Sequence, residues 1–346
     1  MISNRAIRRA PLLLLGALAV AACGSDGDTD TTATDNESDA GVVTVYTGRH
    51  YGIEPVFEEF TAATGIEVRF TTGNDPELRE RLTAEGANTP ADIVMTADAA
   101  NIELSAAAGL LASVDSEVLV DTVPEELRSA DNEWFTLSQR ARVIIASSER
   151  VDNPPSTYAD VGDPIWADRI CLRPSTHPYT QSLVASLVIA EGEERATEIV
   201  QSWVDNNPLF INSDTDIYNA VANGDCDVAL ANTYYLGRLL TENPDFPVEI
   251  VWPEQDGRGA HVNVSTAAVT ANAPNRDNAV ALLEWLATDG QAQFANVNFE
   301  YPADPSVDPD PIVAGWGEFD ADLAAVRQLG ANQAAAIDIL SVTGYE

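Results

Sequence analysis

The chain of 346 residues contains no lysine, and all 18 of its basic residues are arginines, against 55 aspartates and glutamates. So large an excess of negative charge repels nucleic acid and anionic membrane surfaces, which excludes both as expected partners. The acidity itself is not evidence for a metal site, because scattered surface carboxylates more often reflect solubility or a saline habitat.

Histidine is also scarce, with three in the whole chain. A hydrolase needs a nucleophile and a base, or a metal ion with an open coordination position. The sequence has no His-Glu-x-x-His motif, no Gly-x-Ser-x-Gly motif and no clustered His/Asp spacing. We therefore expect a binding protein and not an enzyme, and a metal-dependent hydrolase is the least favoured alternative.

The apolar stretch at the N-terminus, residues 12–22, is shorter than the ~20 residues that a membrane-spanning helix needs. Three arginines precede it, and small residues lead directly to Cys23. This arrangement resembles a bacterial lipoprotein signal, so residues 1–23 are expected to be a signal peptide with lipidation at Cys23. A plain secretory peptide is the alternative, and both export the protein. Residues 24–41, rich in Ser, Thr, Asp, Glu and Gly, are predicted to form a disordered acidic tether.

Cysteine is rare as well, and only Cys171 and Cys226 remain beyond the signal. An even pair in an exported protein favours a disulfide, with two buried free thiols as the alternative. Thiolates are poor ligands for a hard metal ion, so neither cysteine is expected to bind one.

The remaining ~305 residues are enough for two α/β lobes. Short apolar strands alternate with amphipathic helices, which predicts a mostly parallel sheet covered by helices. The expected strands are residues 42–46, 66–70, 91–95, 142–146, 170–173, 227–230, 248–251 and 267–270. The expected helices are residues 54–64, 76–85, 99–108, 180–191, 216–223, 276–287, 290–296, 318–330 and 332–340.

Tyrosines follow three of these strands. Arg49-His50-Tyr51 follows the first strand, Tyr179 lies in the loop after residues 170–173, and Tyr234 and Tyr235 follow residues 227–230. Ligands of parallel α/β sheets bind beyond the carboxyl ends of strands. Tyrosines usually serve packing, but a hard, charged phenolate is also a strong ligand for ferric iron, which can displace a proton whose free pKa is about 10.

In this order, several segments resemble the periplasmic ferric-iron-binding proteins of ABC importers, the group with the cyanobacterial and Campylobacter iron binders. They are Val45-Tyr46-Thr47-Gly48-Arg49-His50-Tyr51, Cys171-Leu172-Arg173-Pro174-Ser175, Ala231-Asn232-Thr233-Tyr234-Tyr235-Leu236-Gly237-Arg238, and residues 90–93, 140–144, 179–186, 261–265 and 298–302. The resemblance covers nearly the whole body of the chain.

The resemblance implies a two-lobed periplasmic-binding-protein fold of the transferrin-like, class II type, which closes over one ferric ion. The N-lobe is expected to comprise residues 42–138 and 267–310 and the C-lobe residues 139–266. C-terminal helices in residues 311–346 would pack on the lobes. The hinge strands are expected near residues 138–144 and 262–268.

By the same resemblance, the iron ligands are expected to be Tyr51, Tyr179, Tyr234 and Tyr235, with His50 left open as a fifth. His177, in a loop where the family usually has other residues, is either an extra ligand or an exposed loop histidine. A guanidinium would hold phenolates ionised, and the candidates for this role are Arg49, Arg140 and Arg173.

The resemblance also implies a role outside the cytoplasm. The protein is expected to be a monomer, attached to the membrane by its lipid alone, that delivers Fe3+ to an ABC permease. A two-lobed binding protein for an oxyanion, an organic anion or chelated iron is the alternative function.

Overall fold

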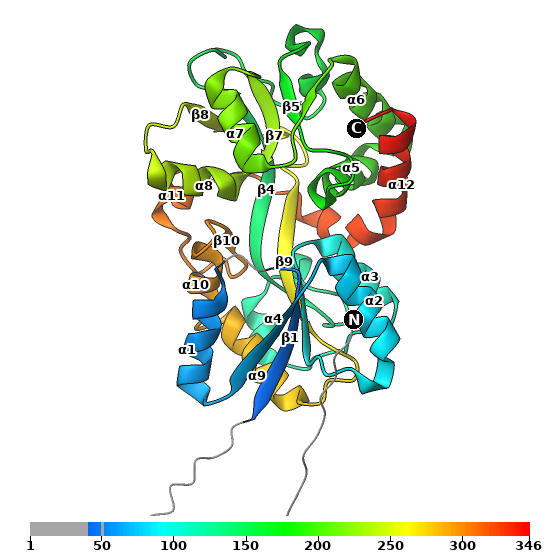
Figure 1. The fold of residues 1–346 in the computed structure, drawn as a ribbon, viewed down its shortest axis with the longest axis vertical. Coiled ribbons are helices and arrows are strands. Elements are labelled where there is room, and N and C mark those ends of the chain that lie inside the picture. Colours follow the sequence, from blue (N-terminus) through cyan, green and yellow to red (C-terminus); the bar gives the residue numbers. More distant parts are fainter. Residues whose placement is uncertain (1–40, 50–51) are drawn as a thin grey trace, which may run out of the picture. The chain divides into compact units, whose positions relative to one another are not determined.

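The computed structural model describes residues 41–49 and 52–346, and these residues belong to one compact unit (Figure 1). The predicted signal peptide with Cys23, nearly all of the predicted tether, and the predicted ligands His50 and Tyr51 lie outside the described residues. Within the described part, none of the helices combines the length and the apolar character needed to cross a membrane.

Ten strands of the described residues form one mixed sheet. They are β1 (Val42–Thr47), β2 (Glu67–Thr72), β3 (Ile93–Thr96), β4 (Phe135–Ser147), β5 (Ile170–Leu172), β6 (Leu209–Phe210), β7 (Val228–Asn232), β8 (Val248–Val251), β9 (Val262–Val269) and β10 (Tyr301–Pro302). Their order is β2-β1-β3-β9-β4-β7-β5-β6, and β8 and β10 also pair with β4.

The centre of this sheet differs from the prediction. β1 pairs in parallel with β2 and β3, and β5 does so with β6 and β7, as expected. In contrast, β4 and β9 are antiparallel to all of their neighbours. The prediction of a mostly parallel sheet is therefore right for the strands at the two ends, β2-β1-β3 and β7-β5-β6, and wrong at the centre. There, β4 and β9 run in opposite directions, because the chain passes between the two ends along β4 and returns along β9.

The α-helices of the described residues cover this sheet. They are α1 (Glu54–Thr64), α2 (Asp75–Glu85), α3 (Ala99–Ala107), α4 (Glu117–Thr122), α5 (Pro178–Glu191), α6 (Glu193–Asp205), α7 (Asp214–Asn223), α8 (Thr233–Glu242), α9 (Arg276–Ala287), α10 (Gln291–Asn296), α11 (Pro311–Ala314) and α12 (Leu329–Val342). Short 3-10 helices occupy Gly86–Asn88, Glu125–Leu127, Asp160–Gly162, Pro164–Trp166 and Leu323–Gln328.

β4 serves both halves of the sheet. Residues 135–141 pair with β9, and residues 142–147 pair with β7 and β8. We call the part built on β1, β2, β3, β9 and β10 the first half, and the part built on β5, β6, β7 and β8 the second half. β4 and β9 run side by side between them (Figure 1), and both predicted hinge segments lie on these two strands.

Helix α1 illustrates how the sequence builds the first half. A proline in its first turn suits the helix start, and Gly65 ends the helix in the left-handed conformation at φ 78°. Phe57 and Phe60 lie on its buried face. Their rings pack edge-on against Phe70 of β2, at 4.8 Å, and Trp285 of α9, at 5.7 Å. Aromatic contacts of this kind contribute beyond the area that they bury.

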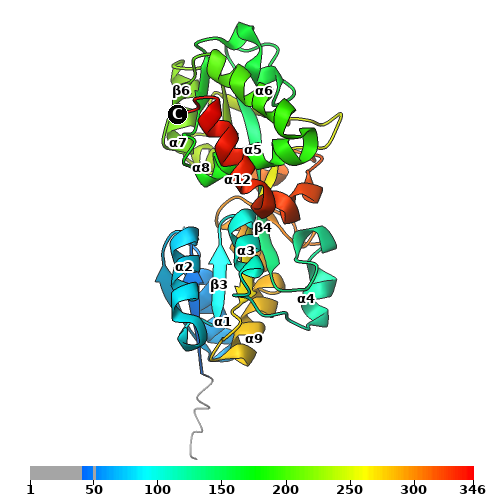
Figure 2. The same cartoon turned by 90° about the vertical axis from the view of Figure 1, so that its right-hand side faces the viewer.

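The C-terminal region departs from the predicted helix at residues 318–330. Gly317 has φ 82°, and Ala321 forms a parallel bridge with Ala260, whose N–H donates to the carbonyl of Asp320 at 2.7 Å. This pairing holds residues 318–322 extended, so helical structure begins only at Leu323. α12 then packs against α5 and α6 of the second half and α3 of the first (Figure 2).

Candidate metal centre

Two neighbouring parallel strands each lead into a helix with a tyrosine in its first turn. β5 leads to α5, where Tyr179 follows Pro178, and β7 continues directly into α8, which carries Tyr234 and Tyr235 in its first turn. The prediction of Tyr179 in a loop is wrong, because proline suits the first turn and His177 caps the helix, its Nδ1 accepting from the Tyr179 N–H at 3.2 Å. Both helix N-termini carry partial positive charge, which favours an anion there.

The structure brings these phenols together. The Tyr179 and Tyr234 hydroxyl oxygens lie 3.0 Å apart, and the Tyr234 and Tyr235 rings stack with their centroids 4.1 Å apart. Tyr234 is buried, whereas Tyr179 and Tyr235 are half-buried. Two of the five predicted ligands, Tyr179 and Tyr234, therefore meet at their hydroxyls, and Tyr235 stacks on Tyr234 without lining the small cavity described below. The other two, His50 and Tyr51, are not described.

The pKa of the Tyr234 hydroxyl is raised well above its usual value, first by burial and then by Tyr179 and Tyr235, while Arg140 opposes the shift. Tyr234 is thus a neutral phenol when nothing is bound. A cation that takes this oxygen as a phenolate must displace a proton.

Guanidinium groups surround the phenols. The central guanidinium carbon of Arg140 lies 5.7 Å from the Tyr179 ring centroid, and that of Arg142 lies 6.0 Å from it. The same atom of Arg238 lies 5.2 Å from the Tyr234 ring centroid and 5.6 Å from that of Tyr235. Of these three arginines, only Arg140 is predicted from the sequence, since no local pattern distinguishes Arg142 or Arg238.

The other two predicted arginines are already paired. Arg49 forms a buried salt bridge with Glu300 at 2.8 Å. Arg173 lies 3.7 Å from Asp214, whose other oxygen binds Arg142 at 2.6 Å. Asp214 also accepts from the backbone N–H of Asn232 at 3.0 Å, so it anchors the strand end from which α8 begins. Neither carboxylate, Asp214 or Glu300, is predicted from the sequence.

A cavity of about 20 Å³ lies among these groups. Its lining residues come from both halves of the fold: Gly48, Arg49, Ala97, Arg140, Tyr179, Tyr234, Arg238, Asn298 and Glu300. Such a volume holds roughly one water-sized sphere. Among the described residues, no group of three or more His, Cys, Asp or Glu side chains could hold a metal ion.

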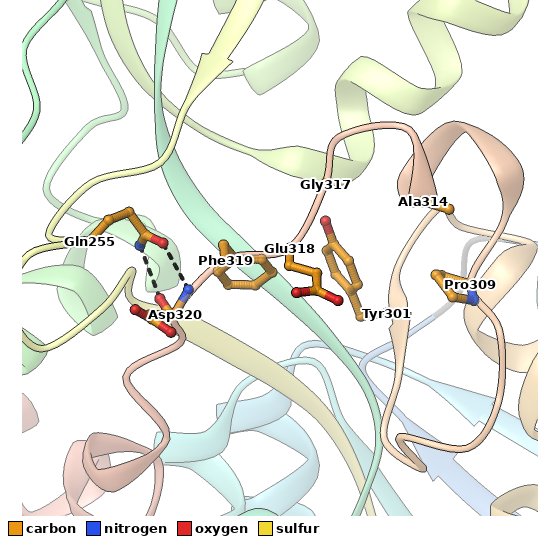
Figure 3. A pocket seen from close by; sticks show the side chains of 8 residues that line it. All are labelled: Gln255, Tyr301, Pro309, Ala314, Gly317, Glu318, Phe319 and Asp320. Atoms are coloured by element: carbon orange, nitrogen blue, oxygen red, sulfur yellow. Dashed lines mark hydrogen bonds between the residues drawn. The ribbon is translucent and has the colours of Figure 1, made fainter.

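A larger cavity of about 710 Å³ lies elsewhere (Figure 3). Its lining residues are Gln255, Tyr301, Pro309, Ala314, Gly317, Glu318, Phe319 and Asp320. None of the described predicted ligands (Tyr179, Tyr234 and Tyr235) or predicted arginines is among them, so size alone does not identify the functional site. The small cavity is the candidate because it gathers the phenols and guanidiniums.

A disulfide joins Cys171 of β5 to Cys226, with their Cα atoms 5.8 Å apart. It confirms the disulfide prediction and ties β5 to the start of β7, the two strands that lead to the tyrosine-bearing helices.

Comparison with known proteins identifies the family. Residues 56–321 match the model of the bacterial extracellular solute-binding proteins. The chain belongs to this family. This solute-binding protein is 39% identical to "Iron uptake protein A1" of a Synechocystis sp. over 96% of its own chain and 95% of the relative.

Two solved structures share the fold. A Trichodesmium protein, described as IdiA or FutA in complex with iron and citrate ligands, has a TM-score of 0.83 and 36% identity, over 88% of this chain and all of the other. The ferric binding protein from Campylobacter jejuni has a TM-score of 0.81 and 31% identity, over 88% of this chain and all of the other. The two-lobed fold is therefore confirmed, and so is the interpretation of the chain as a solute-binding protein and not an enzyme.

Proposed function

We propose that the protein captures Fe3+ outside the cytoplasm, in the cavity between its two lobes, and delivers it to an ABC permease. The ligands would be the phenolates of Tyr51, Tyr179, Tyr234 and Tyr235, with His50 as the fifth candidate. The observation that carries the proposal is the 3.0 Å approach of the Tyr179 and Tyr234 hydroxyls in the lining of a cavity sized for one ion. Relatives named for iron uptake and ferric-iron binding support the choice of metal.

The charges around the cavity suit this cargo. Fe3+ is a hard ion that binds anionic oxygen, and four phenolates would exceed its three positive charges by one. Arg140 and Arg238 would offset such a surplus and lower the phenol pKa values once the metal is bound, whereas the charge of Arg142 is already balanced by Asp214. The partial positive charge at the N-termini of α5 and α8 would also lower the phenol pKa values.

Ligands on both lobes would make binding and closure a single event. The ion would complete its coordination shell only in the closed state, and this difference in affinity would drive the hinge on β4 and β9. We retain residues 42–138 with 267–310 and residues 139–266 as the proposed lobes, with residues 311–346 packing on them.

Chelated iron or an organic anion is the second candidate. The arginines that line the cavity favour it, since guanidinium groups bind carboxylates in two-point contacts. The Trichodesmium structure, which holds iron and citrate, also favours it. A citrate titration with and without Fe3+ separates the two, because free-ion capture needs no organic anion.

The test is the visible spectrum of protein loaded with ferric citrate and then freed of excess salt. We expect an orange-red sample from phenolate-to-iron charge transfer, with one iron per chain by elemental analysis. The double variant Tyr234→Phe/Tyr235→Phe should lose the band and most of the metal. A colourless loaded protein, or unchanged metal content in the double variant, would show that the site assignment is wrong.

Membrane attachment is proposed to rest on a lipid at Cys23, and the protein is proposed to act as a monomer. Expression of the whole chain should place it in the membrane fraction, and Cys23→Ser should move it to the soluble extracytoplasmic fraction. Recovery of both forms in the soluble fraction would favour the plain secretory peptide.

A further inference from the structure

Residues 298–300, between α10 and β10, follow a helix end that is built in an unusual way. The N–H of Phe299 donates to Asn296, and the N–H of Glu300 donates to Ala295 at 3.1 Å. These bonds close the end of α10 with Phe299 at φ 55°, in the left-handed region. Helices usually place glycine at such a position, because a bulky residue is strained there. Something outside this turn must therefore hold Phe299 in place.

The contact that holds Phe299 lies on α8, one turn after the tyrosines. A Cβ added to Gly237 would lie 2.5 Å from Cγ and 2.6 Å from Cβ of Phe299, so the aromatic side chain rests on the bare helix surface. Glycine inside a helix is itself unfavourable. Phe299 and Gly237, each unfavourable in its own local structure, thus face each other. Residues that are locally unfavourable are expected where function requires them.

The residues on either side of Phe299 extend this contact. Asn298 accepts a hydrogen bond from Arg238 at 2.6 Å, and the guanidinium of Arg238 lies over the rings of Tyr234 and Tyr235. Asn298 is buried and lines the small cavity. The same arginine therefore contacts both the tyrosine pair of the second half and the turn that follows α10.

Glu300 completes the connection to the first half. It binds Arg49, the residue just before His50 and Tyr51, and accepts a hydrogen bond from Ser138 of β4. Arg49 also donates to Ser265 of β9, and its guanidinium lies 4.9 Å from the Phe294 ring centroid on α10. Residues 298–300 are thus connected to β4, to Arg49 and, through Arg49, to β9. They also contact α8, which carries Tyr234 and Tyr235.

We propose that residues 298–300 form an interlobe latch, which holds α8 and its tyrosines against the strand end that carries Arg49. The inference rests on the proposed function only for the identity of the cargo. The latch stabilises the closed state, so that iron leaves only after the contacts at Gly237 and Arg238 have separated.

The first measurement is the rate of iron transfer to excess chelator, followed by loss of the visible band. Gly237→Ala places a methyl group inside the Phe299 side chain, and Asn298→Ala removes the acceptor for Arg238. Each should release iron at least about tenfold faster than wild type, since a hydrogen bond to a charged group or a lost packing contact has an effect of this size. The position of the band should not move, because the tyrosines are untouched.

Two further variants serve as controls. Gly257→Ala adds a methyl group whose nearest neighbour would be a carbonyl oxygen at 3.6 Å, an ordinary contact, and should release iron at the wild-type rate. Tyr345→Phe removes a buried hydroxyl that donates to the Arg173 carbonyl and does not line the small cavity, so it should also release iron at the wild-type rate.

The second measurement needs no metal. Small-angle X-ray scattering of the iron-free protein should show a more open average conformation in Gly237→Ala and Asn298→Ala than in wild type and Gly257→Ala. If both variants fold, keep the wild-type scattering curve and release iron within twofold of the wild-type rate, the latch is refuted. If the wild type binds no iron but the scattering differs as expected, the latch stands and the proposed cargo is wrong.

Discussion

One part of the acid sensitivity expected of the proposed iron binding can be assigned to Tyr234. Tyr234 is protonated in the empty protein throughout the neutral range, because burial and the neighbouring tyrosines raise its pKa well above 10. If it binds iron as a phenolate, binding releases one proton from it, and the association constant rises tenfold per pH unit on its account. Tyr234→Phe removes this proton and this dependence.

The magnitude follows from the single proton. Between pH 6 and pH 8, the ratio of the wild-type to the Tyr234→Phe association constant should increase about 100-fold, or ~2.7 kcal/mol. Competition against one chelator at each pH gives this ratio directly, because the protons of the chelator cancel between the two proteins. The variant also loses a ligand, so its affinity should be lower at every pH.

Tyr345→Phe is the matched control. Tyr345 is also a buried tyrosine, but its hydroxyl donates to the carbonyl of Arg173 at 2.9 Å and does not line the cavity. Its substitution should leave the ratio constant across the pH range. A ratio for Tyr234→Phe that does not change between pH 6 and pH 8 would show that Tyr234 does not bind iron as a phenolate.

Two other predictions concern stability. Reduction of the Cys171–Cys226 disulfide, which spans 55 residues, should lower the free energy of unfolding by about 4 kcal/mol in a urea titration; no change would refute a stabilising role. Burial, and then Asp98, raise the pKa of Asp75 to about 7, so its contribution to stability is present below about pH 4 and is lost as pH rises through 7. The free energy of unfolding of the Asp75→Asn variant, relative to that of wild type, should therefore rise by roughly 4 kcal/mol between pH 4 and pH 8. A constant difference between the denaturant midpoints of the two proteins across this pH range would contradict this.

Local patterns predicted most elements of the fold but not its longest strands. α1 and α9 agree with the helices expected at residues 54–64 and 276–287, because their apolar spacing is clear. β4 was expected only at residues 142–146, since its first part mixes buried polar residues such as Ser138 and Arg140 with apolar ones. Ser138 and Arg140 are buried because they face the site. The run of apolar residues that marks a buried strand is therefore interrupted where the strand supplies residues to the site.

Of the four α-helices that the sequence did not predict, α4, α6, α8 and α11, the two longest were missed for different reasons. α6 carries Ala196, Ile199, Val200 and Trp203 on its buried face, a regular helical spacing that the sequence does show. α8 is less visible, because its first turn consists of Thr233 and the tyrosine pair, residues that suit a strand end as well as a helix. The fold of this segment is decided by its contacts and not by its own preferences.

The charge of the site could not have been inferred from the charge of the chain. The whole sequence carries a formal charge of −37, yet the small cavity is lined by Arg49, Arg140 and Arg238 against one carboxylate, Glu300. These residues come from parts of the chain far apart in sequence, so no local window contains their pairing. An acidic surface attracts cations in general, whereas a locally positive cavity rejects a bare cation until phenols ionise around it. The proposed site would therefore select a metal acidic enough to remove those protons, and common divalent ions such as Mg2+ and Ca2+ are poorly suited to do so.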